Sequence, residues 1–254
     1  MAAMLDQSLT AQLPWRESAE RASRRRSAIT LAGALLGLLV GGVGGRLAMM
    51  LLARLNPEAT GVTSDDGFRI GQFTVGATLQ LLLTGTVFGL VGACVYALVR
   101  HLMVGPRWFQ VAAIAIGPAV VVGAEIVHGD GVDFRLLKPT WLAIALFLAI
   151  PALYAALLTL VAEHWIREDS WAGRAPLPIA AIPLLFLIPL APLLAVMVAL
   201  WALGEALRRD ARFRTGLGHP ALPWVARLGL VAVFAFALAD LIGDVTELED
   251  GLHR

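Results

Sequence analysis

The stretch GALLGLLVGGVGGR, residues 33–46, places a glycine at every fourth position of an apolar run and ends in an arginine. The repeating glycines are Gly33, Gly37, Gly41 and Gly45. In water this helix would be weak, because each glycine costs about 1 kcal/mol relative to alanine. In lipid the same spacing forms a smooth groove that lets a second helix approach closely. The stretch therefore predicts a tightly packed membrane helix.

The composition of the whole chain also indicates a membrane protein. Its 254 residues are 58% hydrophobic and only 15% charged, whereas soluble domains carry about 25% charged residues. Several apolar runs reach the roughly 20 residues that a membrane-crossing helix needs. We expect an all-α, polytopic transmembrane helix bundle. Its six predicted spans are residues 27–54, 74–99, 108–128, 139–163, 177–206 and 222–243.

The placement of arginine predicts how the chain is oriented. Five arginines precede the first span, and loops on the cytoplasmic side of a membrane are enriched in arginine and lysine. We therefore expect residues 1–26 to be a cytoplasmic N-terminal tail, residues 27–243 the transmembrane domain and residues 244–254 an acidic C-terminal tail. The chain has 19 arginines and one lysine, a bias that we interpret as that of a GC-rich bacterial genome. The cytoplasmic (plasma) membrane of a bacterium is thus the expected location.

The block 177–206 allows two interpretations, because prolines interrupt it. An internal proline removes a helix hydrogen bond and kinks the backbone, and the block contains Pro178, Pro183, Pro189 and Pro192. As one span it leaves the arginines of residues 208–214 outside, against the usual arginine distribution. The alternative is five spans plus a re-entrant hairpin at 177–206, which returns those arginines to the cytoplasm. The C-terminus is cytoplasmic in the first case and external in the second.

Short motifs in the first two thirds of the chain resemble those of a known group. They are GRLAM at 45–49, NP at 56–57, TSDDG at 63–67, GQFT at 71–74, DFRLL at 133–137 and PTWL at 139–142. Over residues 30–165 the chain resembles uncharacterised multi-pass membrane proteins of GC-rich bacteria. The resemblance implies a membrane fold, and it carries over no activity, substrate, cofactor or site residue.

Charged residues inside spans are the first candidates for function in a membrane protein. Arg46 falls in the outer half of the first span or snorkels to the interface. Glu125, near the outer end of the third span, is its natural partner, and His128 follows on the same helix face. Asp240 joins them only if the C-terminus is external. This charge cluster is either a packing device or a substrate or proton site.

The second predicted span repeats the glycine pattern of the first. Gly85 and Gly89 are again four residues apart, and Gly92 follows. Pairing of the two spans through their small faces is the simplest use of both patterns. Contact with a second copy of the chain is the other use that we consider.

Patterns of enzymes and of metal or haem sites are scarce. The outer loop at residues 128–133 has one histidine and two aspartates, without the ligand number and spacing of a calcium loop. The H-E-x-x-H zinc motif and the phosphate-binding loop G-x-x-x-x-G-K-[ST] are absent from the sequence, and no histidine is placed mid-span to face another. We expect no metal, no cofactor, no nucleic-acid partner and no enzymatic activity.

Two classes of function therefore remain. The first is a non-enzymatic packing, assembly or complex-subunit protein of the lipid bilayer, which associates with a second copy or with another membrane protein. The second is a small transporter or channel that uses Arg46 and Glu125, joined by Asp240 if the C-terminus is external. The glycine grooves favour the first, and the charged residues and broken block favour the second.

Overall fold

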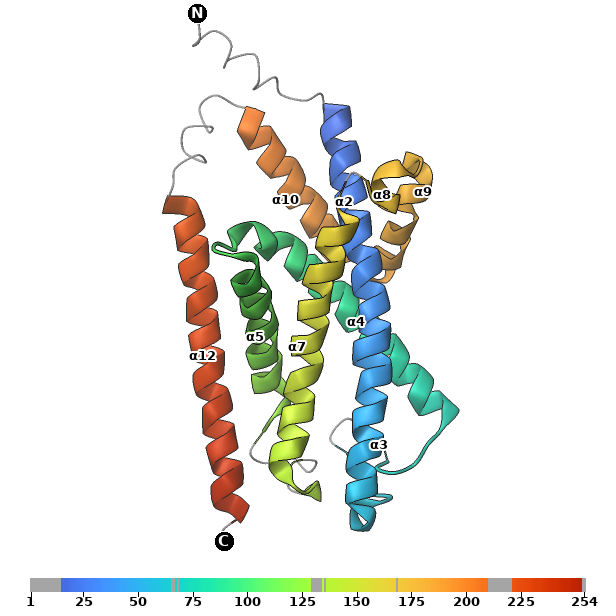
Figure 1. Ribbon diagram of the computed structural model, residues 1–254, viewed down its shortest axis with the longest axis vertical. Coiled ribbons are helices and arrows are strands. Elements are labelled where there is room, and N and C mark those ends of the chain that lie inside the picture. Colours follow the sequence, from blue (N-terminus) through green and yellow to red (C-terminus); the bar gives the residue numbers. More distant parts are fainter. Residues whose placement is uncertain are drawn as a thin grey trace, which may run out of the picture.

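The computed structural model describes residues 15–64, 67, 69–128, 134, 136–167, 169–209 and 221–252. The described chain forms an all-α bundle, as predicted, whose long helices run side by side (Figure 1). Five helices within these residues are long and apolar enough to cross a membrane. They comprise Trp15–Leu55, Val75–Leu102, Arg107–Ile126, Thr140–Trp165 and Pro223–Leu248.

The first of these helices is 41 residues long and has three parts. The α-helical parts α2 (Trp15–Leu36) and α3 (Gly45–Leu55) flank a π-helical segment, η1 (Gly37–Gly44). At 1.5 Å per residue, 41 residues span about 60 Å, twice the apolar thickness of a bilayer. The described part of the expected tail begins at Trp15 and is rich in arginine. It therefore belongs to this same helix.

The remaining described elements connect and cover the long helices. They are η2 (Pro57–Ala59), α4 (Val75–Val99), η3 (Arg100–Leu102), α5 (Arg107–Ile126), α7 (Thr140–Trp165), α8 (Trp171–Arg174), α9 (Leu177–Ala181), η4 (Ile182–Leu190), α10 (Ala191–Arg209) and α12 (Ala221–Leu252).

The block predicted as a sixth span differs from that prediction. Residues 177–206 do not form one helix but are divided into α9, the 3₁₀ segment η4 and α10. The chain enters the bundle through η4 and turns back along α10 toward the end from which it came (Figure 1). This is the course of the re-entrant alternative. The prolines explain it, because each one lacks the N–H that a continuous helix requires.

Contacts with α2 hold the returning segment in place. Arg24 Nη1 donates to the carbonyl oxygens of Ala172 (2.7 Å) and Ala175 (2.6 Å), at and just after α8. The Ser27 hydroxyl donates to the carbonyl of Ala180. Leu187 of η4 is 1% exposed and packs with residues of α2 and α4. One side of η4 is thus packed against protein at Leu187, while Leu185 and Ile188 are 61% and 62% exposed.

The glycines bring the first helix and α4 into close contact. A β-carbon built on Gly85 would lie 2.7 Å from the Gly37 carbonyl oxygen, and one built on Gly89 would lie 2.6 Å from Gly37 Cα. Gly33 meets Ala93 and Gly89 in the same way, and Gly41 faces Gly85 less tightly, at 3.3 Å. A β-carbon on Gly45 would meet nothing closer than 3.9 Å. A β-carbon on Gly42 would lie 2.9 Å from Leu82 Cα, so the close approach runs from Gly33 to Gly42 and ends before Gly45.

The other helices pack in two further groups. Residues of α5, α7 and α12 share one apolar core with Leu52 of α3, and α2, α4 and α7 share another. At the end of the bundle where the N-terminus lies, Glu163 of α7 accepts a hydrogen bond from Tyr96 (2.8 Å) and pairs with Arg100 (3.0 Å). At the opposite end the buried Asn56 side chain bonds both the N–H (2.7 Å) and the carbonyl (2.9 Å) of Lys138.

Candidate functional site

The candidate site lies on α3, at the end of the bundle opposite the N-terminus (Figure 1). Arg46, Met49, Met50 and Ala53 line a cavity there, and their spacing places them on one face of the helix. Gly45, Ala48 and Leu52 form the buried face of α3. Leu47 and Leu51 are 61% and 44% exposed, so a third face points away from the protein.

The opposite wall of the cavity comes from the segment between α3 and α4. An antiparallel bridge joins Thr63 to Arg69, and Ile70 exchanges backbone hydrogen bonds of 2.9 Å with Val62 and Gly61. Gly61 and Gly71 have φ of +89° and +75°, a backbone region that glycine adopts without strain. The segment is thus folded back on itself and ends at Thr74, whose side chain accepts from Ala77 N at the start of α4 (3.2 Å).

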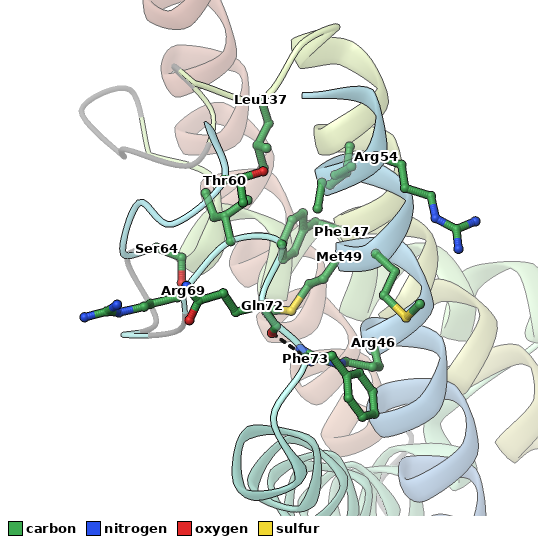
Figure 2. Close-up of a pocket in the computed structure, with 15 residues that line it drawn as sticks. Arg46, Met49, Arg54, Thr60, Ser64, Arg69, Gln72, Phe73, Leu137 and Phe147 are labelled. Carbon is green, nitrogen blue, oxygen red and sulfur yellow. Dashed lines mark hydrogen bonds between the residues drawn. The ribbon is translucent and has the colours of Figure 1, made fainter. Parts of the chain in front are cut away.

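The cavity enclosed by these walls has a volume of ≈ 240 Å³. Figure 2 shows Arg46 at one end, beside Phe73 and Gln72, while the guanidinium groups of Arg54 and Arg69 point away from the cavity on opposite sides. None of the lining residues that the structure describes is acidic. Those residues are Arg46, Met49, Met50, Leu52, Ala53, Arg54, Thr60, Ser64, Arg69, Ile70, Gly71, Gln72, Phe73, Leu137 and Phe147.

The guanidinium of Arg46 is only partly satisfied. Nη2 donates to the Gln72 carbonyl (3.1 Å), and Cζ lies 4.9 Å from the centre of the Phe73 ring, a distance at which cation and ring attract each other. Nε is buried without a hydrogen-bond partner. Arg46 forms no ion pair with any carboxylate that the structure describes. Arg46 therefore has more hydrogen-bond donors than its described contacts use.

The other members of the predicted charge cluster do not join Arg46. Glu125 is exposed in the last turn of α5, and Asp240 is exposed on α12. His128 lies near α12, with its Nδ1 4.0 Å from Asp244 Oδ2. The helices explain this separation, because α5 packs on α7 and α12, whereas the first helix packs on α4. The expected pair of Arg46 with Glu125 is not among the contacts of the described residues.

Most of the cavity was not predicted from the sequence. The segment 55–73 was expected only as an outer loop, and its residues Thr60, Arg69, Gln72 and Phe73 were not predicted site residues. The motif GQFT, residues 71–74, was noted only for its resemblance to other membrane proteins. The acidic loop at residues 129–133, considered above for a metal, lies outside the described residues.

Comparison with known proteins provides no assignment for this site. The chain matches no protein-family model, no curated protein and no solved structure. Function must therefore be argued from the residues of the site.

Proposed function

We propose that this chain is a non-enzymatic integral membrane protein that binds an anionic ligand in the Arg46 cavity. The observation that supports this proposal is the buried, unpartnered Nε of Arg46 in a cavity whose described lining residues include no acidic side chain. A buried donor without a partner costs about 1–3 kcal/mol, and an arginine bonds an anion through hydrogen bonds that are stronger than those between neutral groups. An anion in the cavity would give the guanidinium the acceptors that it lacks.

The same contacts argue for binding rather than transport. Arg46 and Glu125 form no ion pair, and Glu125 and Asp240 are both exposed. A carrier needs polar groups that can hold its substrate near the middle of the membrane. The described contacts do not join these charges into a central site, so transport through Arg46 and Glu125 is not proposed.

Assembly through the glycine face is also less well supported than the sequence indicated. The glycines on the first helix are covered by α4 of the same chain, and Gly85 and Gly89 face back onto them. Association with a second copy or with another membrane protein would have to use a different surface. The bilayer is the partner that we propose for the exposed apolar side chains of the long helices.

The proposed location is the plasma membrane of a bacterium, with the N-terminus in the cytoplasm. Figure 1 shows the ends of α4 and α7 and the starts of α5 and α12 at the same end of the bundle as the start of α2. The arginines at these points are Arg100, Arg107, Arg167, Arg174 and Arg227. Together with the arginines of α2 they form the arginine-rich end that faces the cytoplasm in membrane proteins. The Arg46 cavity would then face the outside.

Thermal unfolding of the purified protein in a neutral detergent tests the proposal. Two anions serve as probes: dodecyl phosphate, which is amphiphilic, and glycerol 3-phosphate, which is soluble. Saturation with a ligand at about 100 times its Kd stabilises by about 2.7 kcal/mol, which raises Tm by roughly 5–10 °C for a chain of this size. We expect at least one probe to produce such a shift in the wild type and in Arg25→Gln, and neither to do so in Arg46→Gln.

Arg25 is a suitable control because it is an exposed arginine at the other end of the same helix. If neither probe raises Tm, or if both raise it equally in Arg46→Gln, the proposed binding function is wrong.

A further inference from the structure

We infer that the ligand of the Arg46 cavity is an anionic phospholipid of the leaflet at that end of the bundle, with its phosphate at Arg46 and an acyl chain along η1. The inference rests on the proposed binding function and adds the chemical class and the source of the ligand. Three features of the site support it: its charge, its apolar wall and its position beside a lipid-facing row.

The charge of the site selects an anion. Arg46 is the cation inside the cavity, and the exposed Arg54 and Arg69 lie on its two sides with their guanidinium groups directed outward (Figure 2). Thr60, which has a hydroxyl, also lines the cavity, and none of the described lining residues has a carboxylate. A phosphodiester has one negative charge and several acceptor oxygens, which match one guanidinium and a nearby hydroxyl donor.

The apolar wall selects a ligand that carries hydrocarbon as well as charge. The large apolar side chains among the remaining lining residues are Met49, Met50, Leu52, Ile70, Phe73, Leu137 and Phe147. Methionine side chains are flexible and polarizable, so they adapt to an irregular apolar ligand. A free phosphate or sulfate would leave this wall uncovered.

The volume of the site limits how much of the ligand it encloses. Pockets that bury most of a drug-sized molecule measure about 300–1,000 Å³, and this cavity is smaller, at ≈ 240 Å³. It can therefore enclose a headgroup and the start of a chain, but not a whole phospholipid. The rest of the ligand must lie outside the cavity, in a medium that accepts hydrocarbon.

Exposed apolar side chains of η1 provide the path for that hydrocarbon. Leu39 and Val43 are 56% and 41% exposed and precede Arg46 in the same helix. Because α3 continues from Arg46 to its outer end at Leu55, these two side chains lie on the side of Arg46 that faces the middle of the membrane. A phosphate at Arg46 would thus place an acyl chain, which extends from the headgroup toward the membrane centre, against Val43 and Leu39 in the bilayer.

Phe73 is placed to admit the headgroup. Its ring lies over the Arg46 guanidinium and is 65% exposed, so it can turn aside without opening a packed core. The cation–π contact that would be lost is weak at an exposed site. Hydrogen bonds to a charged group are stronger than this contact, so the exchange favours the phosphate.

Photo-crosslinking in lipid nanodiscs tests this inference. The probes are phosphatidylglycerol and phosphatidylcholine with the same diazirine near the carboxyl end of one acyl chain, and mass spectrometry locates the crosslinks. We expect phosphatidylglycerol to crosslink to residues 39–50 and 69–73 roughly tenfold more than phosphatidylcholine in the wild type, because phosphatidylcholine has the same phosphate but adds a quaternary ammonium that Arg46, Arg54 and Arg69 repel. Arg25→Gln should keep this ratio, Arg46→Gln should bring it close to one, and Arg46→Lys should fall between them.

The outcomes separate the two proposals. Equal labelling of residues 39–50 by both lipids in the wild type, or an unchanged ratio in a folded Arg46→Gln protein, would overturn the lipid assignment. If glycerol 3-phosphate raises Tm through Arg46 while the lipid ratio is one, the binding function stands and the ligand is a soluble anion. If Arg46→Gln fails to fold, the ratio in Arg46→Lys decides, because a value equal to that of the wild type contradicts a guanidinium–phosphate contact.

Discussion

Gly89 of α4 lies where the two glycine-bearing helices approach most closely. A β-carbon on this residue would lie 2.6 Å from Gly37 Cα and 3.0 Å from Gly37 N, both backbone atoms that cannot turn aside. The same addition on Gly76, near the start of α4, would meet nothing within 4 Å. These two glycines of one helix therefore separate the effect of close packing from the effect of helix propensity.

We predict that Gly89→Ala destabilises the protein and that Gly76→Ala does not. Overpacking costs about 1–3 kcal/mol, which outweighs a gain of up to about 1 kcal/mol from replacing glycine by alanine in a helix. Thermal unfolding in detergent micelles should show a lower Tm for Gly89→Ala and an equal or higher Tm for Gly76→Ala. An equal Tm for both variants would mean that the glycine contact can widen at no cost.

Arg24 shows how one side chain supports a whole element. Its Nη1 atom donates to three carbonyl oxygens, those of Ala172, Gly173 and Ala175. Carbonyls at the end of a helix lack intrahelical partners and favour a nearby cation. The short helix α8, only four residues long, is thus held against α2, and the start of the re-entrant segment is held with it.

We predict that Arg24→Gln loosens this segment and that Arg25→Gln leaves it unchanged, since Arg25 is exposed. Loss of one hydrogen bond to a charged group, about 1.5–3 kcal/mol, should speed local opening roughly tenfold or more. Hydrogen–deuterium exchange of residues 171–190 measures this directly. Equal exchange in the two variants would show that Ser27 and Leu187 hold the segment without Arg24.

The π-helical segment η1 is the element that the sequence did not predict. Four of its eight residues are glycine, and it precedes Arg46 in one continuous helix. A wider turn changes the direction in which later side chains point, because a π-helix bonds residue i to residue i+5. The face on which Arg46 lies therefore cannot be derived from α-helical spacing alone. This is one reason why the expected contact of Arg46 with Glu125 is not found among the described residues.

At the scale of the whole molecule, five membrane-long helices and a returning segment place the two ends of the chain apart. The start of α2 and the end of α12 lie at opposite ends of the bundle (Figure 1). We predict that reporter enzymes fused to the N-terminus and to the C-terminus are active on opposite sides of the membrane. Activity of both fusions on the same side would support six spans.

The sequence by itself determined the class of the fold and the approximate positions of the five membrane-long helices that the structure describes. Long apolar runs with few charges are sufficient for this, because bilayer thickness imposes a length. The spacing of Gly33 and Gly37, and of Gly85 and Gly89, also pointed to the faces that meet. Each of these signals is local in the chain.

Only the tertiary structure decided which charges meet and where a cavity lies. Whether Arg46 contacts Glu125 depends on which helices are neighbours and on a π-helical turn, and neither leaves a periodic signal in the sequence. The cavity needs Arg46 from one element and Gln72 and Phe73 from a folded-back segment. Such contacts between residues distant in sequence arise from packing, and for that reason the glycine stretch predicted a close helix pair but not the environment of the arginine at its end.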